Sequence, residues 1–334
     1  MKKCIIVSVL IVISLSFKLP SVSGQKIGLC IANQYSERWI KEASLMTEGL
    51  KKQGAEVLLE TAEDNSEKQV IQAQKLIDSG VKVLIVVSVD CAASAKIVEI
   101  AHKAGVIVIA YDRLILNSDL DYYVSFNSVK VGELLATHLL KLKPTGNYIF
   151  FNGPLVDFNS KLIREGVMNV LGEPLKHGSI TLVLDKNLNE WAELEGYMEM
   201  STYLSGKNPK PDAVITGADV IGVGVANALD EHNLATTVPV VGQDGDLQAC
   251  KGIVNGKYSA TILKSPKNLA AEVVLLAYKL AKNEKVDKST FKFVNNGKVD
   301  VPSLLLEPKL IEKSNMDKDV IQSGHLTREQ VYQK

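Results

Sequence analysis

The sequence predicts an α/β protein made of two doubly wound, Rossmann-like lobes of parallel sheet. From Lys26 onward, short β-branched runs alternate with amphipathic helical stretches, which is typical of βαβ units. The series occurs twice, and its strands are apolar enough to be covered on both faces. A chain of 334 residues with 46% hydrophobic content is long enough for two separate cores. Two such lobes place a cleft between them.

The elements of both series can be placed by residue number. Glycines at positions 80 and 105 end two of the helices in the first series. That series has predicted strands at residues 26–32, 56–60, 83–87 and 106–110, with helices at 37–52, 66–79 and 92–103. The second series has predicted strands at residues 148–152, 180–184, 213–216, 238–242 and 260–263, with helices between them.

Residues 1–25 are typical of an export signal. Two lysines follow Met1, the run from Cys4 to Phe17 is apolar, and small residues precede Gln25. An apolar run of 14 residues is shorter than the roughly 20 that a membrane-spanning helix needs. We therefore expect a protein secreted to the periplasmic or extracellular face. An uncleaved N-terminal anchor, which would tether the protein to the membrane, is the alternative.

Composition and motif spacing exclude several classes of function. Lys plus Arg equals Asp plus Glu at 38 each, so the chain has no net field for a nucleic acid partner. The five histidines are dispersed without metal-ligand spacing, which predicts no metal site. Gly217, Gly222 and Gly224 lack the spacing of a dinucleotide-binding turn, so no cofactor is expected. No cysteine stands where a lipid would be attached. We do not expect an enzyme.

Polar and aromatic side chains follow six of the predicted strands at the ends where a doubly wound fold binds its ligand. These candidates are Arg38, Trp39, Asp112, Arg113, Asp157, Asn159, Trp191, Gln243, Asp244 and Lys264. The set suits a sugar, because indole rings stack on its C–H faces while carboxylates, guanidinium and ammonium groups bind its hydroxyls. The chain has two tryptophans, one in each predicted lobe. Considered one at a time, these residues have ordinary structural explanations. A tryptophan can belong to the core, and Asp157 can cap the helix that follows it.

Several runs resemble the bacterial D-xylose-binding proteins, which belong to the ribose and galactose type of periplasmic binding proteins. The matching runs are Glu37-Arg38-Trp39, Ala110-Tyr111-Asp112-Arg113, Val129 to Leu134, Val156-Asp157 with Asn159, Gly242-Gln243-Asp244 with Asp246, and Asp300 to Ser303. The resemblance implies the type I periplasmic binding protein fold, with both tryptophans stacking on the sugar and the polar candidates bonding its hydroxyls. Ala218 stands where the family has Asn, and Asp219 is a candidate to replace that contact.

The resemblance also implies a domain organisation and a function. Residues 26–126 plus 265–297 would form the N-terminal lobe and residues 127–264 plus 298–334 the C-terminal lobe, joined by a three-segment hinge. We expect an extracytoplasmic D-xylose-binding protein that closes on its sugar and presents it to a membrane partner. That partner is an ABC sugar importer or a sensor histidine kinase. The alternatives are another monosaccharide, of the ribose, arabinose or galactose type, and a repressor-like sugar-responsive core, which the export signal disfavours.

Overall fold

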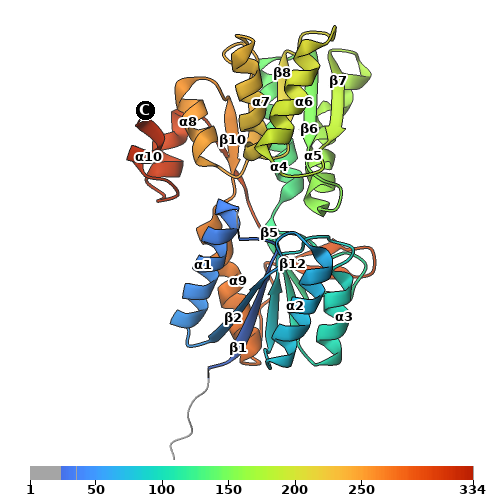
Figure 1. The fold of residues 1–334 in the computed structure, drawn as a ribbon, viewed down its shortest axis with the longest axis vertical. Helices are drawn as coiled ribbons and strands as arrows, with labels where there is room; N and C mark the ends of the chain where they lie inside the picture. The colour runs from blue at the N-terminus through green and yellow to red at the C-terminus, as the bar shows by residue number, and fades with distance from the viewer. Residues whose placement is uncertain (1–23, 35, 334) are drawn as a thin grey trace, which may run out of the picture.

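The computed structural model describes residues 24–34 and 36–333, which form two lobes joined by a narrow waist (Figure 1). Each lobe has its own sheet, of seven strands in one and six in the other. The predicted two-lobed α/β fold is therefore confirmed. The predicted export signal lies outside the described residues, apart from Gly24 and Gln25.

The first lobe is built on a sheet of strand order β11-β12-β5-β4-β3-β1-β2. Its strands are β1 (Lys26–Ile31), β2 (Glu56–Thr61), β3 (Val83–Val86), β4 (Ile107–Tyr111), β5 (Tyr122–Phe126), β11 (Lys292–Asn295) and β12 (Asp300–Leu306). Its helices are α1 (Glu37–Lys52), α2 (Ser66–Asp78), α3 (Ala95–Lys103) and α9 (Pro266–Ala281). The strands β1 to β5 pair in parallel, whereas β11 pairs antiparallel with β12 at the edge.

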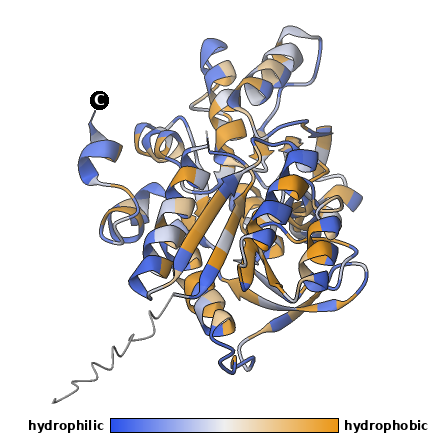
Figure 2. Cartoon of the chain, turned by 60° about the horizontal axis from the view of Figure 1, so that its bottom comes forward, coloured by the Kyte–Doolittle hydropathy of each residue, from blue (hydrophilic) through white to orange (hydrophobic). Residues whose placement is uncertain are grey.

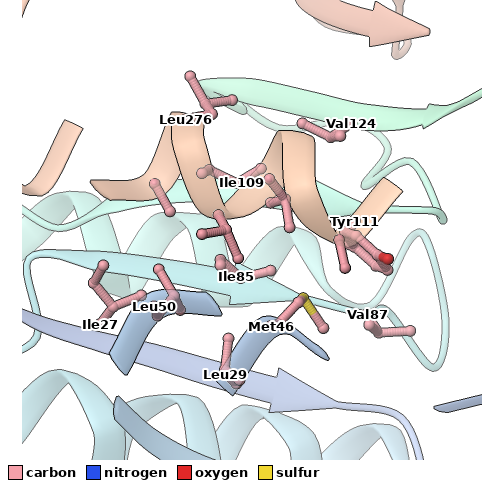
Figure 3. Close-up of a cluster of buried hydrophobic side chains, with 14 of the residues drawn as sticks. Ile27, Leu29, Met46, Leu50, Ile85, Val87, Ile109, Tyr111, Val124 and Leu276 are labelled. Atoms are coloured by element: carbon pink, nitrogen blue, oxygen red, sulfur yellow. The ribbon is translucent and has the colours of Figure 1, made fainter. Parts of the chain in front are cut away.

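Two apolar clusters cover the two faces of this sheet. Helices α1 and α9 pack together on one face, where Leu50 and Leu276 meet Ile85 and Ile109 of the sheet (Figure 3). Helices α2 and α3 pack on the other face. Because successive residues of a strand point to opposite faces, Leu29 joins the first cluster while Cys30 joins the second. The strands are correspondingly hydrophobic along their length, and the helices carry hydrophilic outer surfaces (Figure 2).

The second lobe repeats the plan with the strand order β13-β10-β9-β8-β6-β7. Its strands are β6 (Gly146–Asn152), β7 (Ile180–Asn187), β8 (Ala213–Thr216), β9 (Val240–Gln243), β10 (Ala260–Leu263) and β13 (Lys309–Ile311). Its helices are α4 (Ser128–Leu142), α5 (Phe158–Lys176), α6 (Glu193–Ser205), α7 (Asp219–Glu231), α8 (Leu247–Asn255) and α10 (Arg328–Tyr332), and Lys313–Asn315 and Asp317–Ile321 add a 3₁₀ and a π turn. Helices α4 and α5 cover one face, and α6, α7 and α8 cover the other.

The chain passes between the lobes three times, and one crossing differs from the predicted boundary. Two crossings fall where expected, after β5 and after β10. The predicted third crossing at residue 298 is wrong, because β12 pairs in parallel with β5 and so belongs to the first lobe. Strand β13 pairs with β10 in the second lobe. The third crossing therefore lies between Leu306 and Lys309.

Candidate functional site

A cavity of about 440 Å³ lies between the lobes, at the carboxyl ends of strands from both sheets. It brings together all of the candidates taken from the strand ends. These are Arg38, Trp39, Asp112, Arg113, Asp157, Asn159, Trp191, Gln243, Asp244 and Lys264. Side chains separated by up to 226 positions in the sequence thus face one hollow.

Arg38, in the first turn of α1, joins carboxylates of both lobes. Its Nε donates to Glu42 Oε1 at 2.9 Å, one helical turn further on, and its terminal nitrogens pair with Asp112 and, across the cleft, with Asp244 Oδ1 at 3.3 Å. Burial alone would raise the pKa of Asp112, but the attraction of Arg38 and Lys264 lowers it to about 2. Asp112 is therefore an ionised acceptor at neutral pH.

Lys264 completes the same charge cluster from the end of β10. Its Nζ lies 3.0 Å from Asp244 Oδ1 and 3.9 Å from Asp112 Oδ2, and the residue is buried. The two cations Arg38 and Lys264 thus share Asp112 and Asp244 beside the cavity, and Arg38 also pairs with Glu42. Asp112 and Asp244 have φ angles of 62° and 111°, a region that non-glycine residues seldom adopt and that recurs at ligand sites.

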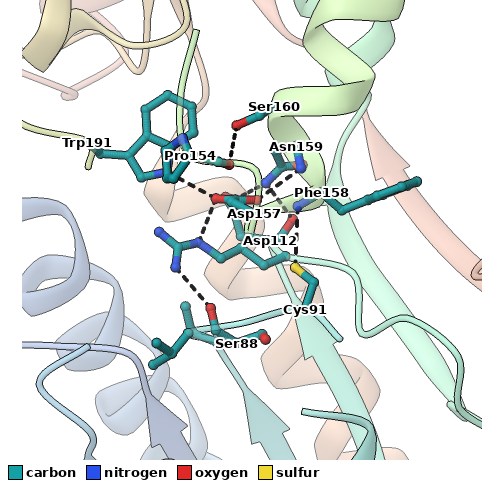
Figure 4. Close-up of polar contacts among 12 residues, drawn as sticks. Ser88, Cys91, Asp112, Pro154, Asp157, Phe158, Asn159, Ser160 and Trp191 are labelled. Atoms are coloured by element: carbon teal, nitrogen blue, oxygen red, sulfur yellow. Dashed lines mark hydrogen bonds and ion pairs between the residues drawn. The ribbon is translucent and has the colours of Figure 1, made fainter. Parts of the chain in front are cut away.

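Arg113 and Asp157 form a second pair across the cleft (Figure 4). Arg113 Nε lies 2.8 Å from Asp157 Oδ2, and its NH1 group donates to the Ser88 carbonyl at 2.9 Å. Trp191 Nε1 donates to the same Asp157 oxygen at 3.2 Å. The other oxygen, Oδ1, accepts from the backbone N–H of Asn159 at 2.9 Å and caps α5. Asp157 thus has both the capping role and a position in the site.

Asn159 adds a neutral link between the lobes. Its Nδ2 group donates to the carbonyl and to Oδ1 of Asp112, at 3.2 and 3.1 Å. Ser128 Oγ donates to Asn159 Oδ1 at 2.9 Å, which fixes the orientation of the amide. The amide nitrogen therefore faces the first lobe.

The two tryptophans line the cavity from opposite lobes but sit differently. Trp39 is 5% exposed and belongs to the apolar cluster beneath α1 and α9, and the guanidinium groups of Arg38 and Arg113 lie 4.5 and 5.6 Å from its ring centroid. Trp191 is partly exposed in the loop after β7. A Cβ atom on Gly153 would lie 2.1 Å from Trp191 Cη2, so this ring position requires glycine there.

Asp219 does not line the cavity, and its prediction as a ligand contact is wrong. Its carboxylate is fully buried behind the loop after β9, where Oδ2 accepts from the backbone N–H groups of Gly245 and Asp246 and from Thr261 Oγ1 at 2.6–3.0 Å. Burial, and then the nearby Asp246 carboxylate, raise its pKa. These hydrogen bonds hold the loop, so Asp219 is not free to replace the amide that Ala218 lacks.

Gln243 and Ala218 form a wall with few polar contacts. Gln243 Nε2 donates to the Gly217 carbonyl at 2.7 Å, whereas its Oε1 is buried and has no hydrogen-bond partner within residues 24–34 and 36–333. Since the Gly217 carbonyl can only accept, this bond fixes which end of the amide is the oxygen. Ala218, Val220 and Val223 continue the wall with apolar side chains.

Metal-binding clusters and membrane-spanning helices are both missing from the part of the chain that the structure describes. Residues 24–34 and 36–333 contain no cluster of three or more side chains able to hold a metal ion. Over the same residues, no helix has the length and apolar character needed to span a membrane.

Comparisons with known proteins agree with this geometry. The model of the periplasmic binding protein domain matches residues 27–285. The chain is 36% identical to the D-xylose-binding periplasmic protein of Haemophilus influenzae, over 92% of both chains. It is 34% identical to the D-xylose-binding periplasmic protein of Escherichia coli, over 95% of this chain and 97% of that one. The chain belongs to the periplasmic binding protein family.

Solved structures support the same assignment. An ABC transporter solute-binding protein from Clostridium phytofermentans with bound β-D-glucose has a TM-score of 0.85 and 28% identity, over 92% of this chain and all of that one. A Caulobacter myo-inositol-binding protein, at 21% identity with a TM-score of 0.79, shows the shared fold alone. The predicted membership in the sugar-binding branch of the family and the type I fold are confirmed. Members of this branch are solute receptors, and this periplasmic binding protein is not an enzyme.

This periplasmic binding protein also has cavity residues that the sequence reasoning missed. They are Glu193, Val220, Val223, Leu247 and Gln248. Glu193, Val220, Leu247 and Gln248 lie in the first turns of α6, α7 and α8, and Val223 lies one turn further along α7, so all five come four to seven residues after a strand ends. The start of a helix that follows a strand was the signal that could have found them. Glu42 was also missed, although it stands four residues after Arg38 on a helix, the spacing of a side-chain pair.

Proposed function

We propose that this protein is an exported receptor that binds D-xylose between its lobes. The observation that carries the proposal is the shared cavity, into which both lobes direct charged and aromatic side chains. In this proposal Trp39 and Trp191 stack on the C–H faces of the pyranose, and the ionised groups bond its hydroxyls. The relatives from Haemophilus influenzae and Escherichia coli are both named for D-xylose.

The charge pairs across the cleft explain how a neutral sugar would be held. Arg38 faces Asp244 and Arg113 faces Asp157, so each pair offers donors and acceptors side by side. A sugar hydroxyl is both a donor and an acceptor, and can therefore bridge a guanidinium and a carboxylate at once. Binding then links the lobes and shifts the balance from open to closed forms.

Gln243 supplies one further acceptor in the proposed site. Gln243 lines the cavity, and its buried Oε1 has no hydrogen-bond partner among the described residues, which carries a free-energy cost of about 1–3 kcal/mol. A sugar hydroxyl that donates to this oxygen removes that cost. The apolar wall of Ala218, Val220 and Val223 would lie against the adjacent carbons of the ring.

Calorimetric titration with D-xylose, D-ribose, L-arabinose, D-galactose and D-glucose tests the proposed ligand. We expect D-xylose to bind most tightly, and hexoses more weakly because their hydroxymethyl group must fit a closed cavity. Glucose is a necessary member of the panel, since one structural relative holds it and a 29% identical protein of Rhizobium radiobacter is named a multiple sugar-binding receptor. Strong binding of a hexose with no binding of any pentose would contradict the D-xylose assignment. An Asp244→Ala variant should lose most of the heat in either case.

The proposal includes a membrane partner and a location outside the cytoplasm. The closed protein would present its sugar to an ABC permease or to the extracellular domain of a histidine kinase. Crosslinking on cells, with the protein sugar-bound and sugar-free, distinguishes the permease from the kinase. The captured membrane protein is then identified. N-terminal sequencing of the secreted protein tests the signal: a start near Gln25 indicates cleavage, and a start at Met1 indicates an anchor.

A further inference from the structure

One contact between the lobes lies apart from the groups that line the cavity. The loop after β6 rests on the loop after β3, where the backbone N–H of Cys91 donates to the Val156 carbonyl at 3.0 Å. In return, the backbone N–H of Phe158 donates to Cys91 Sγ at 3.4 Å (Figure 4). Cys91, Val156 and Phe158 are all absent from the cavity lining. This reciprocal pair of bonds therefore joins the lobes through residues that do not line the cavity, although Val156 and Phe158 flank Asp157, which does.

The side chain of Phe158 adds an apolar contact at the same place. Phe158 is the first residue of α5 in the second lobe, yet its ring packs against the apolar cluster beneath α2 and α3 of the first lobe. Cys91 is 1% exposed, and burial raises the pKa of its thiol to about 12, so the sulfur stays a neutral, weakly accepting atom. Opening the cleft would expose the ring and break both hydrogen bonds.

We propose that Cys91, Val156 and Phe158 form an interlobe latch that sets sugar affinity by stabilising the closed form. The three residues contact one another and none of them lines the cavity, so their bonds favour closure whether or not a sugar is bound. When only part of a population is competent to bind, the apparent dissociation constant equals the intrinsic one divided by the competent fraction. A stronger latch therefore raises affinity with no added contact to the ligand.

Phe158→Ala is the decisive variant, with Leu155→Ala as its matched control. Leu155 is an apolar residue of the same loop that is 79% exposed. We expect Phe158→Ala to weaken sugar binding about tenfold, mainly through faster dissociation, and to increase the radius of gyration of the empty protein in small-angle X-ray scattering. Leu155→Ala should match the wild type in both measurements. Cys91→Ala, which removes the sulfur acceptor but keeps the backbone donor, should weaken binding about threefold.

The scattering measurement distinguishes a lost latch from a displaced Asp157. Weaker binding by Phe158→Ala with an unchanged radius of gyration would mean that the substitution acts by displacing Asp157, and would overturn the latch. Unchanged binding and unchanged scattering would overturn it as well. The latch does not depend on which solute fills the cavity. If the wild type binds no sugar but Phe158→Ala expands the empty protein, the latch stands and the proposed function fails.

Discussion

The two tryptophan walls of the cavity show how differently the same side chain can be built into a binding site. Trp39 is part of the hydrophobic core of the first lobe and carries two guanidinium groups over its ring. Trp191 extends from a loop, rests on Gly153 and uses its N–H to bond Asp157. Trp39 therefore lies within a core, whereas Trp191 packs against the edge of both apolar clusters of the second lobe and stays partly exposed. Substitutions in each wall test that difference.

The largest effect is expected for Trp39→Ala. Removing a buried indole from the core leaves a cavity, which should lower the free energy of unfolding by about 3–5 kcal/mol. Sugar binding should also be lost, because Arg38 and Arg113 lose the ring that positions them. Urea denaturation measures the first effect and calorimetry the second.

Trp39→Phe is the control that separates the two roles of this wall. Phenylalanine keeps an aromatic face and most of the apolar volume, so we expect it to recover most of the stability. A Trp39→Ala protein as stable as the wild type would show that this residue is a ligand wall alone, and the contrast with Trp191 would disappear.

Trp191→Ala should weaken binding by roughly 30-fold, about 2 kcal/mol, because the sugar loses its stacking surface and Asp157 loses a donor. Because Trp191 is partly exposed but packs against two apolar clusters, the free energy of unfolding should fall by about 1–2 kcal/mol, less than for Trp39→Ala. Calorimetry measures the loss of binding, and urea denaturation measures the change in stability. A stability loss equal to that of Trp39→Ala would contradict the proposed asymmetry.

Gly153→Ala tests the Trp191 wall without removing it. The added Cβ would overlap the indole, so the ring must move out of its place. We expect an intermediate loss of affinity with Trp191 still present. Binding unchanged from the wild type would indicate that the exact ring position is unimportant.

Much of this arrangement could be predicted because the relevant patterns are local. Helix α1 and strands β8 and β10 have the predicted bounds. The ten candidates chosen because they follow predicted strands all line the cavity, from both lobes. Strands β5, β11, β12 and β13 were not predicted, and the omission of β11 and β12 has a physical reason. Strand β12 contains Pro302, which is unfavourable inside a sheet, and β11 is a mostly exposed edge of four residues. Strand pairing far along the chain, not composition, decides which lobe β12 joins, so the third crossing could not be read from the sequence.

Asp219 shows that position after a strand does not by itself place a side chain in the site. It stands beside Ala218 after β8, as a ligand contact would, but its carboxylate turns inward to hold the next loop. Spacing gives the end of the sheet at which a residue lies. It does not give the direction of the side chain, which depends on donors such as Thr261 that come from another strand.

Asp157→Asn probes the group that connects the two walls, and its expected effect is smaller. Asp157 accepts from Trp191 and pairs with Arg113, whose guanidinium lies near the ring of Trp39. Loss of the charge should weaken sugar binding about tenfold. The α5 cap survives because Asn caps helices as well as Asp, so the melting temperature should change little. A large drop in melting temperature would show that the ion pair, rather than the cap, is the structural contribution of Asp157.

The last prediction concerns the pH dependence of stability and Asp246, which lines the cavity from the start of α8. Burial, and then the nearby Asp244 carboxylate, raise the pKa of Asp246 from 3.8 to about 7. The folded protein therefore keeps a proton that the unfolded chain releases near pH 4, and the free energy of unfolding falls as the pH rises from about 4 through 7. Asp246→Asn removes this penalty, and over the described residues the side chain makes no capping bond, so the variant should melt several degrees above the wild type at pH 8, with the difference vanishing near pH 4. Melting curves at pH 4, 6 and 8 measure it, and a constant offset between the two proteins would contradict the raised pKa.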